Sequence, residues 1–161
     1  MKRDPYKYVH FGKGRPRERI FLSKDELRII EEHQPQKQWT WRAKQIAIIC
    51  CYTGVAYADL MTIDWKSHKE VHGKKCILDH HRQKTGVLEP IIINDKVSAA
   101  LEELDWVIPR LSNHEMNSFL RDLLNDCGIH KPVTMHCLRH TYATLLLQSG
   151  VGVYTTSKLL P

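Results

Sequence analysis

Residues 136–160, HCLRHTYATLLLQSGVGVYTTSKLL, are the most informative stretch of this 161-residue chain. Their pattern predicts a helix over residues 136–148. Side chains three and four positions apart on a helix share one face, so we expect His136, Arg139 and His140 to project in the same direction. An isolated His-x-x-Arg pattern is more typical of a solvent-exposed helix face, but the sequence around it makes this motif far more specific.

The other helix signals predict a mainly helical fold. Ser23 and Glu26 form an S-x-x-E capping box at the start of the first helix. Residues 46–51 are apolar on nearly all sides, which is typical of a central, buried helix. Ser112 is the expected N-cap of a later helix that Gly128 closes. Helices are expected after Ser23, over residues 40–52, 56–62, 96–104, 113–127 and 136–148, and from about residue 153.

Residues 64–94 depart from the helical pattern and predict a three-stranded antiparallel sheet. A turn at residues 72–73 between two β-rich runs indicates a hairpin. Residues 82–86 form a second turn, which leads into a third strand over residues 87–93 that Pro90 interrupts. The predicted fold class is therefore mainly α with a small antiparallel three-stranded β-sheet.

The composition is that of an ordinary globular protein of one domain. Hydrophobic residues make up 42% and charged residues 26%, with 24 Lys and Arg against 18 Asp and Glu. No apolar run approaches the ~20 residues of a membrane span, and no secretory signal opens the chain. We therefore expect no contact with a membrane and a cytoplasmic location. The net charge of +6 favours a polyanionic partner.

Residues 1–20 are basic and rich in Gly and Pro, which predicts a linker or arm before a domain over residues 21–161. The arm either contacts the polyanionic partner or is a solubilising tail. The five cysteines form no C-x2-C pair and the ten histidines are scattered, so we expect buried, reduced thiols and no metal site.

Three motifs give the chain a resemblance to a known family. Residues 136–144 are similar to the H-x-L-R-H-T-[FY]-A-T box of the tyrosine recombinases, the phage-integrase family. Residues 53–60, TGVAYADL, are similar to the family's T-G-L-R-x-x-E-L box, and residues 84–86 to its β-hairpin lysine motif. The order and spacing agree, over residues 21–161, and the resemblance is closest to integrases of conjugative transposons.

The resemblance implies the catalytic-core fold of these enzymes and site-specific DNA recombination. Such enzymes cut one strand by attack of a tyrosine hydroxyl, which leaves a 3′-phosphotyrosyl link and a free 5′-hydroxyl. The reaction needs no metal or other cofactor. The implied partners are double-stranded DNA and, in the full-length assembly, other protomers of the integrase.

The resemblance also assigns roles to residues. Arg139 suits the non-bridging oxygens of the phosphate, because its fork of donors binds two oxygens at once. His136 would accept a proton or donate a hydrogen bond. Lys84, at a hairpin tip, would reach the minor groove and protonate the leaving 5′-oxygen. Asp59 is expected to brace the site, and His140 to make a structural hydrogen bond.

One departure from the family concerns a missing arginine. The family places arginine where this chain has Ala56, which cannot pair with a phosphate. We expect Arg82 to substitute, since period-two alternation would put it on the same strand face as Lys84. An equally open alternative is that Arg82 only binds a DNA phosphate or faces solvent. Thr85 is expected to contact DNA beside these two residues.

A second departure concerns the nucleophile. In the family, the nucleophilic tyrosine follows the segment that this chain ends with at Pro161, so the nucleophile is expected to be absent from the chain. Neither Tyr142 nor Tyr154 is expected to replace it. The sequence thus predicts a C-terminally truncated catalytic domain that is monomeric and inactive alone. A non-catalytic DNA-binding remnant or regulator with the same fold is the alternative. A helical interaction domain would not explain the spaced cations.

Overall fold

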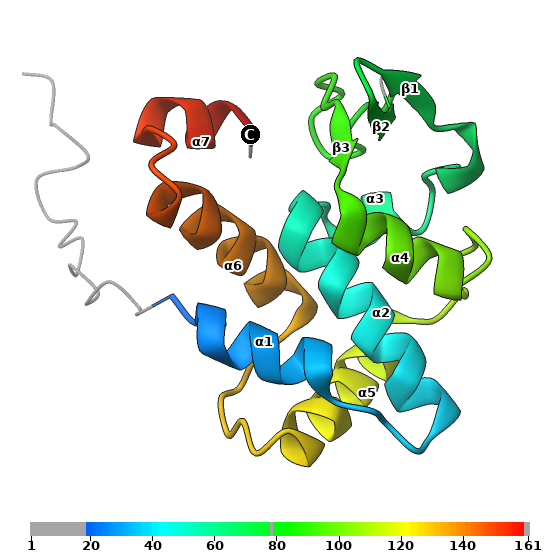
Figure 1. The fold of residues 1–161 in the computed structure, drawn as a ribbon, viewed down its shortest axis with the longest axis vertical. Coiled ribbons are helices and arrows are strands. Elements are labelled where there is room, and N and C mark those ends of the chain that lie inside the picture. The colour runs from blue at the N-terminus through cyan, green and yellow to red at the C-terminus, as the bar shows by residue number, and fades with distance from the viewer. Residues whose placement is uncertain (1–18, 78, 160–161) are drawn as a thin grey trace, which may run out of the picture.

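The apolar run at residues 46–51 lies at the centre of the fold, in helix α2 (Gln38–Thr53). The computed structural model describes residues 19–77 and 79–159. Because α2 is apolar on nearly all sides, it needs neighbours on every side. Figure 1 shows it surrounded by α4 (Asp95–Glu103), α5 (Asn113–Asp126) and α6 (Met135–Gln148), and it packs against all three.

Local signals place the helix starts correctly. Helix α1 (Lys24–Glu32) begins with both hydrogen bonds of the capping box between Ser23 and Glu26, as predicted. Helix α5 begins in the same way behind Ser112, its predicted N-cap. The helix expected over residues 56–62 is only one turn long, α3 (Tyr57–Leu60), followed by a 3-10 helix (Trp65–Ser67).

The predicted three-stranded antiparallel sheet is confirmed, with the order β1 (Lys69–Val71), β2 (Lys74–Ile77) and β3 (Ile91–Ile93). His72 and Gly73 both have positive φ, 51° and 73°, as a tight two-residue hairpin turn requires. In β3 the alternation follows the pleat, with the two outer isoleucines buried and Ile92 exposed. The sheet therefore covers the core with one face only.

The structure corrects two expectations about the segment between β2 and β3. The third strand is shorter than residues 87–93, because the pairing before Pro90 is reduced to one bridge between His81 and Leu88. The turn predicted over residues 82–86 is confirmed, and in it Gly86 N donates to Arg82 O at 2.7 Å, so these residues are not an extended strand. The prediction that Arg82 and Lys84 lie on one face of a strand is therefore wrong.

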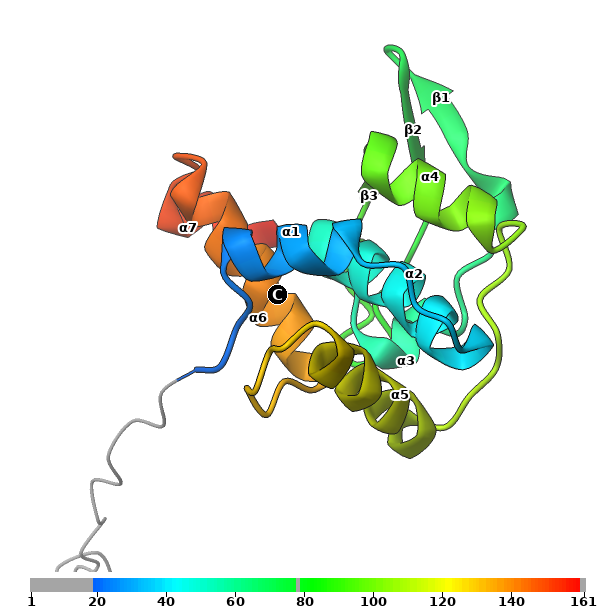
Figure 2. The same cartoon turned by 60° about the horizontal axis from the view of Figure 1, so that its bottom comes forward.

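Helix α7 (Val153–Leu159) contacts α6, and both views show it on the other side of the molecule from the β1–β2 hairpin (Figures 1 and 2). Within the described ranges, no helix is long and apolar enough to cross a membrane. All five cysteines are free thiols. Residues 1–18 of the predicted arm lie outside the described residues.

Candidate functional site

A pocket of about 420 Å³ gathers cationic, imidazole and hydroxyl side chains from four parts of the chain. These parts are the segment before α1, the turn after β2, α6 and α7. The polar side chains that dominate its chemistry are those of Arg19, Arg82, His136, Arg139, His140 and Thr156. All but Arg19 and Thr156 are residues that the sequence singles out, and the structure brings them to one place.

Arg139 lies on α6 and is only 7% exposed. Its Nη1 donates a 2.5 Å hydrogen bond to the carbonyl oxygen of Gly54, which ends α2, and lies 3.5 Å from Oε1 of Glu89. A cation at the C-terminal end of a helix interacts favourably with the helix dipole. Burial lowers the pKa of the Arg139 guanidinium, and the Glu89 carboxylate opposes this effect. The group remains charged in any case, because its ordinary pKa is above 12.

The two histidines of α6 stand one turn apart at the pocket. Their rings are 4.5 Å apart between centroids, in an edge-to-face arrangement. His136 is exposed and His140 half-buried. Burial, followed by the charges of His136, Arg19 and Arg139, lowers the pKa of His140 below its ordinary 6.5. His140 is therefore mainly neutral at pH 7.

The turn at residues 82–86 is held by a hydrogen bond to the side chain of Asp59. This carboxylate is 2% exposed, and its Oδ1 accepts a 2.8 Å hydrogen bond from the backbone N–H of Gln83. Arg82, one residue earlier, is half-buried and lines the pocket. Its charge lowers the pKa of Arg139, so the two cations are close enough to interact.

Other predicted residues lie outside the pocket. Lys84 and Thr85 are exposed at the tip of the turn and do not line it. Ala56 precedes α3 and offers no polar side-chain group. None of the tyrosines that the structure describes lines the pocket: Tyr52, Tyr57, Tyr142 and Tyr154.

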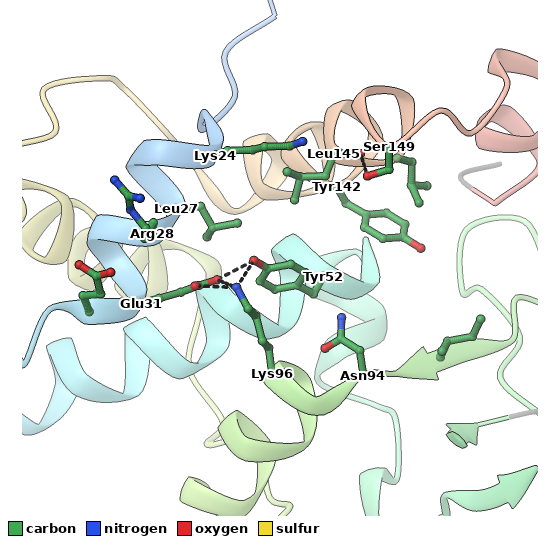
Figure 3. Close-up of a pocket in the computed structure, with 13 residues that line it drawn as sticks. Lys24, Leu27, Arg28, Glu31, Tyr52, Asn94, Lys96, Tyr142, Leu145 and Ser149 are labelled. Carbon is green, nitrogen blue, oxygen red and sulfur yellow. Dashed lines mark hydrogen bonds and ion pairs between the residues drawn. The ribbon is translucent and has the colours of Figure 1, made fainter. Parts of the chain in front are cut away.

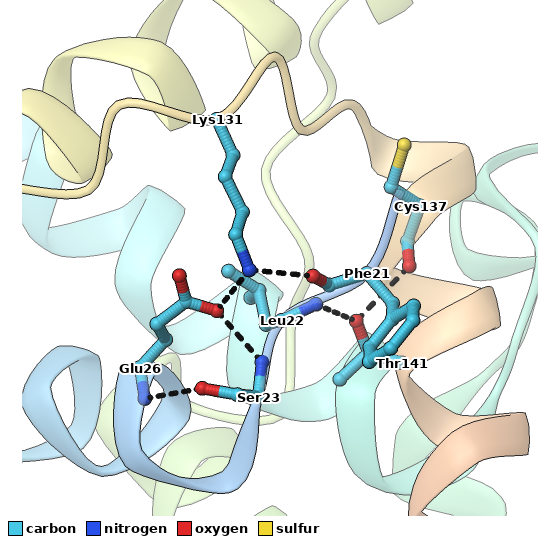
Figure 4. Close-up of polar contacts among 7 residues, drawn as sticks. All are labelled: Phe21, Leu22, Ser23, Glu26, Lys131, Cys137 and Thr141. Carbon is cyan, nitrogen blue, oxygen red and sulfur yellow. Dashed lines mark hydrogen bonds and ion pairs between the residues drawn. The ribbon is translucent and has the colours of Figure 1, made fainter. Parts of the chain in front are cut away.

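Arg19 and Thr156 are pocket residues that the sequence reasoning missed. Arg19 lies in the segment interpreted as a linker. Figure 4 shows how the chain directly after that segment is held: Leu22 N donates a 2.9 Å hydrogen bond to the Thr141 hydroxyl of α6. Lys131 adds a 2.7 Å ion pair to Glu26. No local sequence signal could have revealed this contact, because its partners are 119 positions apart.

A second, larger pocket of about 740 Å³ lies between α1, β3 and α6 (Figure 3). Two of its charged groups pair with each other: Lys96 Nζ donates to Glu31 Oε2 at 2.7 Å, and it also donates to the Tyr52 hydroxyl at 2.8 Å. It contains none of the predicted site residues. Among residues 19–77 and 79–159, no three His, Cys, Asp or Glu side chains are grouped so that they could hold a metal ion.

The comparisons with known proteins support the predicted fold. No family model matches the chain. Over 41 residues it is 42% identical to the tyrosine recombinase XerD of Listeria monocytogenes serotype 4b (strain F2365), a match that covers 26% of this chain and 14% of that protein. The XerD protein of Listeria innocua serovar 6a (strain ATCC BAA-680 / CLIP 11262) matches to the same extent.

Solved structures match over most of the chain. XerA recombinase has a TM-score of 0.66 at 24% identity, covering 88% of this chain and 55% of that one. XerH site-specific recombinase, bound to its difH substrate before cleavage, has a TM-score of 0.69 at 17% identity, covering 87% and 46%. The Tn1549 transposon integrase, in complex with circular intermediate DNA, has a TM-score of 0.63 at 13% identity, covering 92% and 59%.

The chain therefore spans about half the length of the solved structures that it matches. The predicted fold class is confirmed: the described residues have the core fold of tyrosine recombinases. The predicted resemblance to these recombinases is confirmed as well, and it extends to a transposon integrase.

Proposed function

We propose that this chain is the catalytic core of a site-specific DNA recombinase of the tyrosine-recombinase class. One observation carries the proposal: a single pocket gathers Arg82, His136 and Arg139, the groups that a phosphoryl transfer between DNA strands needs. The likeness to a transposon integrase favours the integration and excision of a mobile element, and the full-length enzyme would act on double-stranded DNA together with other protomers, in the cytoplasm.

Arg139 is the central electrostatic group of the proposed reaction. As a tyrosine oxygen bonds to phosphorus and the bond to the 5′-oxygen breaks, negative charge grows on the non-bridging oxygens. A planar guanidinium can donate to two of these oxygens at once. The hydrogen bond to Gly54 and the contact with Glu89 hold Arg139 before DNA arrives, so that little reorganisation is needed.

The imidazoles would handle the proton and position the phosphate. His136 is exposed at the rim of the pocket, where it can take the proton of the attacking hydroxyl or donate a hydrogen bond. His140, kept neutral by burial, supports His136 through the edge-to-face contact of their rings. The two residues therefore have different roles although they share one helix face.

Arg82 would replace the arginine that the family places at Ala56. Support comes from its place in the same pocket as Arg139 and from the interaction between the two charges. Asp59 would act as a positioning residue, because it holds the turn that carries Arg82. Lys84 and Thr85, exposed on the same turn, would contact DNA outside the pocket, with Lys84 donating the proton to the leaving 5′-oxygen.

The nucleophile is proposed to come from outside the described residues. Tyr52 donates its hydroxyl proton to Glu31 and Tyr57 donates to the carbonyl of Leu111, and neither residue lines the pocket. Tyr142 and Tyr154 do not line it either. We therefore expect this 161-residue chain, as a monomer, to bind duplex DNA without forming a covalent adduct.

Two measurements test the proposal. Fluorescence anisotropy should detect duplex DNA binding that weakens steeply with salt. Arg82→Gln should lower the affinity only slightly and reduce the salt dependence by about one phosphate contact, whereas Arg110→Gln, whose side chain is exposed outside the pocket, serves as the control. A protein that extends this chain beyond Pro161 should form a phosphotyrosyl adduct on a suicide substrate. No DNA binding by the wild-type chain would refute the proposal.

A DNA-binding regulator without chemistry is the second candidate. It is favoured by Ala56, which leaves the site one cation short, and by the carboxylate of Glu89 beside Arg139. The coding sequence beyond Pro161 distinguishes the two. A Gly-His pair followed by a tyrosine on a further short helix indicates an enzyme, and a stop codon indicates a regulator.

A further inference from the structure

The hydroxyl of Thr156 is unusual among the hydroxyls of α6 and α7. Thr141, Thr144 and Ser149 each donate to a backbone carbonyl four residues earlier, and Ser157 donates to the carbonyl of Tyr154. Thr156 is only 6% exposed, yet its Oγ1 is buried and has no hydrogen-bond partner among the residues that the structure describes. A buried polar group without a partner is rare and costs stability.

A second unpartnered donor lines the same pocket. The Nε of Arg82 is also buried and makes no hydrogen bond within residues 19–77 and 79–159. Arg82 approaches from the turn after β2 and Thr156 from α7, so the two donors belong to different walls of one pocket. Two residues of a single pocket thus each carry a buried donor without a partner, which a ligand with acceptor atoms could satisfy once these side chains turn towards it.

The charges of the pocket define the chemistry of that ligand. Its polar side chains are cationic, imidazole or hydroxyl groups, and no carboxylate of residues 19–77 and 79–159 lines it, although Glu89 Oε1 lies 3.5 Å from Arg139 Nη1. Arg139 adds a permanent positive charge. A ligand that accepts from both donors in this field is an oxyanion with at least two acceptor oxygens, which fits the non-bridging oxygens of a phosphodiester.

We infer that Thr156 is a phosphate-binding residue of this site: its hydroxyl donates to one non-bridging oxygen of a phosphodiester while Arg82 Nε donates to the other. The inference rests on the proposed function for the identity of the phosphodiester as DNA. It adds a neutral donor from α7 to a site whose other proposed contacts are cations and imidazoles. Rotation about the Cα–Cβ bond of Thr156 is sufficient to turn the hydroxyl towards the ligand.

The test uses the wild-type chain and dimethyl phosphate, a small phosphodiester, in an NMR titration. We expect saturable shifts of the Arg82 Nε–Hε signal and of the Thr156 amide signal. Thr156→Val, which keeps the shape and removes the hydroxyl, should weaken binding by about tenfold. Thr156→Ser should restore it. Thr155→Val is the matched control, because Thr155 is exposed on the same helix and does not line the pocket.

The Tm of the ligand-free protein distinguishes a ligand-binding role of Thr156 from a structural one, because the two roles predict opposite changes in Thr156→Val. Since Thr156→Val removes an unsatisfied buried hydroxyl, it should raise the Tm of the ligand-free chain by about 2–4 °C. A structural hydroxyl would instead make the valine variant less stable. Higher stability combined with weaker dimethyl phosphate binding is the signature of a ligand-binding residue.

The outcomes separate this inference from the proposed function. Equal binding of dimethyl phosphate by Thr156→Val and the wild type would overturn the inference, as would the absence of saturable binding by the wild type. Duplex DNA binding, measured in parallel, tests the proposed function alone. If the chain binds duplex DNA but Thr156→Val does not change dimethyl phosphate binding, the proposed function stands and Thr156 is not a phosphate-binding residue.

Discussion

Nη1 of Arg139 lies 3.5 Å from Oε1 of Glu89, and the two side chains are 9% and 11% exposed. Charges that are this deeply buried carry a large desolvation penalty, which only their mutual attraction and further hydrogen bonds offset. The carboxylate therefore keeps a cation in place at the pocket while no phosphate is bound. An arriving phosphate would compete with Glu89 for the same guanidinium.

Replacing Glu89 should destabilise the fold more than replacing an exposed acid. Glu89→Gln removes from the buried Arg139 the nearby carboxylate that contributes most to keeping it charged, and we expect the free energy of unfolding to fall by about 1–3 kcal/mol. Urea denaturation measures this. Glu102→Gln is the matched control, because its ion pair with Lys75 is 3.4 Å long but exposed, with an expected cost of about 0–1 kcal/mol. Equal costs would show that burial of the pair is unimportant.

Arg82 should matter for cleavage more than for binding. In a protein that carries this chain together with its nucleophile, Arg82→Ala should abolish strand cleavage, because the loss of one transition-state cation costs about 3–4 kcal/mol, or several hundredfold in rate. DNA affinity should fall only slightly, with a salt dependence reduced by about one phosphate contact. A suicide-substrate assay measures the first effect. Near-normal cleavage by Arg82→Ala would show that Arg82 does not take the role of the arginine that the family places at Ala56.

His140 should make the stability of the chain depend on pH. Burial lowers its pKa in the folded state below 6.5, so the unfolded chain binds more protons and ΔG of unfolding rises with pH. Its stabilising contribution is therefore present above the unfolded pKa of about 6.5 and is lost as the pH falls through the lowered folded value. Urea denaturation at pH 7 and pH 5 should show a smaller loss of stability in His140→Gln. His130→Gln, in an exposed loop, should retain the wild-type loss.

Thr141 should be more sensitive to loss of its hydroxyl than its neighbour Thr144. In Thr141→Val the buried backbone N–H of Leu22 loses its acceptor, which costs about 1–3 kcal/mol. Thr144→Val removes only a bond to the carbonyl of His140 in a half-buried position, so its effect should be small. Thermal unfolding of both variants measures the difference. A similar Tm for the two variants would argue against the contact with Leu22.

Features that depend on neighbouring residues could be predicted from the sequence. The capping boxes behind Ser23 and Ser112 satisfy backbone groups within three residues, so the local pattern is sufficient. The shared face of His136, Arg139 and His140 follows from helix geometry alone, and the pocket contains all three. The apolar run at residues 46–51 predicted the central helix because only burial explains such a pattern.

Features that depend on distant partners could not be predicted. The turn at residues 82–86 was predicted, but the Asp59 carboxylate that holds it, 24 positions from Gln83, was not, and Arg82 was wrongly placed on one strand face with Lys84. The pairing of Glu89 with Arg139 has no signature in the order of the residues. Thr156 belongs to no motif, and only the pocket and the unpartnered hydroxyl reveal it.

The hydrogen bond between Leu22 N and the Thr141 hydroxyl has a mechanical consequence. Thr141 is two residues beyond Arg139 on the same rigid helix, so the chain that enters the domain is joined directly to the element that carries the central cation (Figure 4). A displacement of the chain before Ser23 would therefore act on α6, the helix that carries Arg139, through this one hydrogen bond.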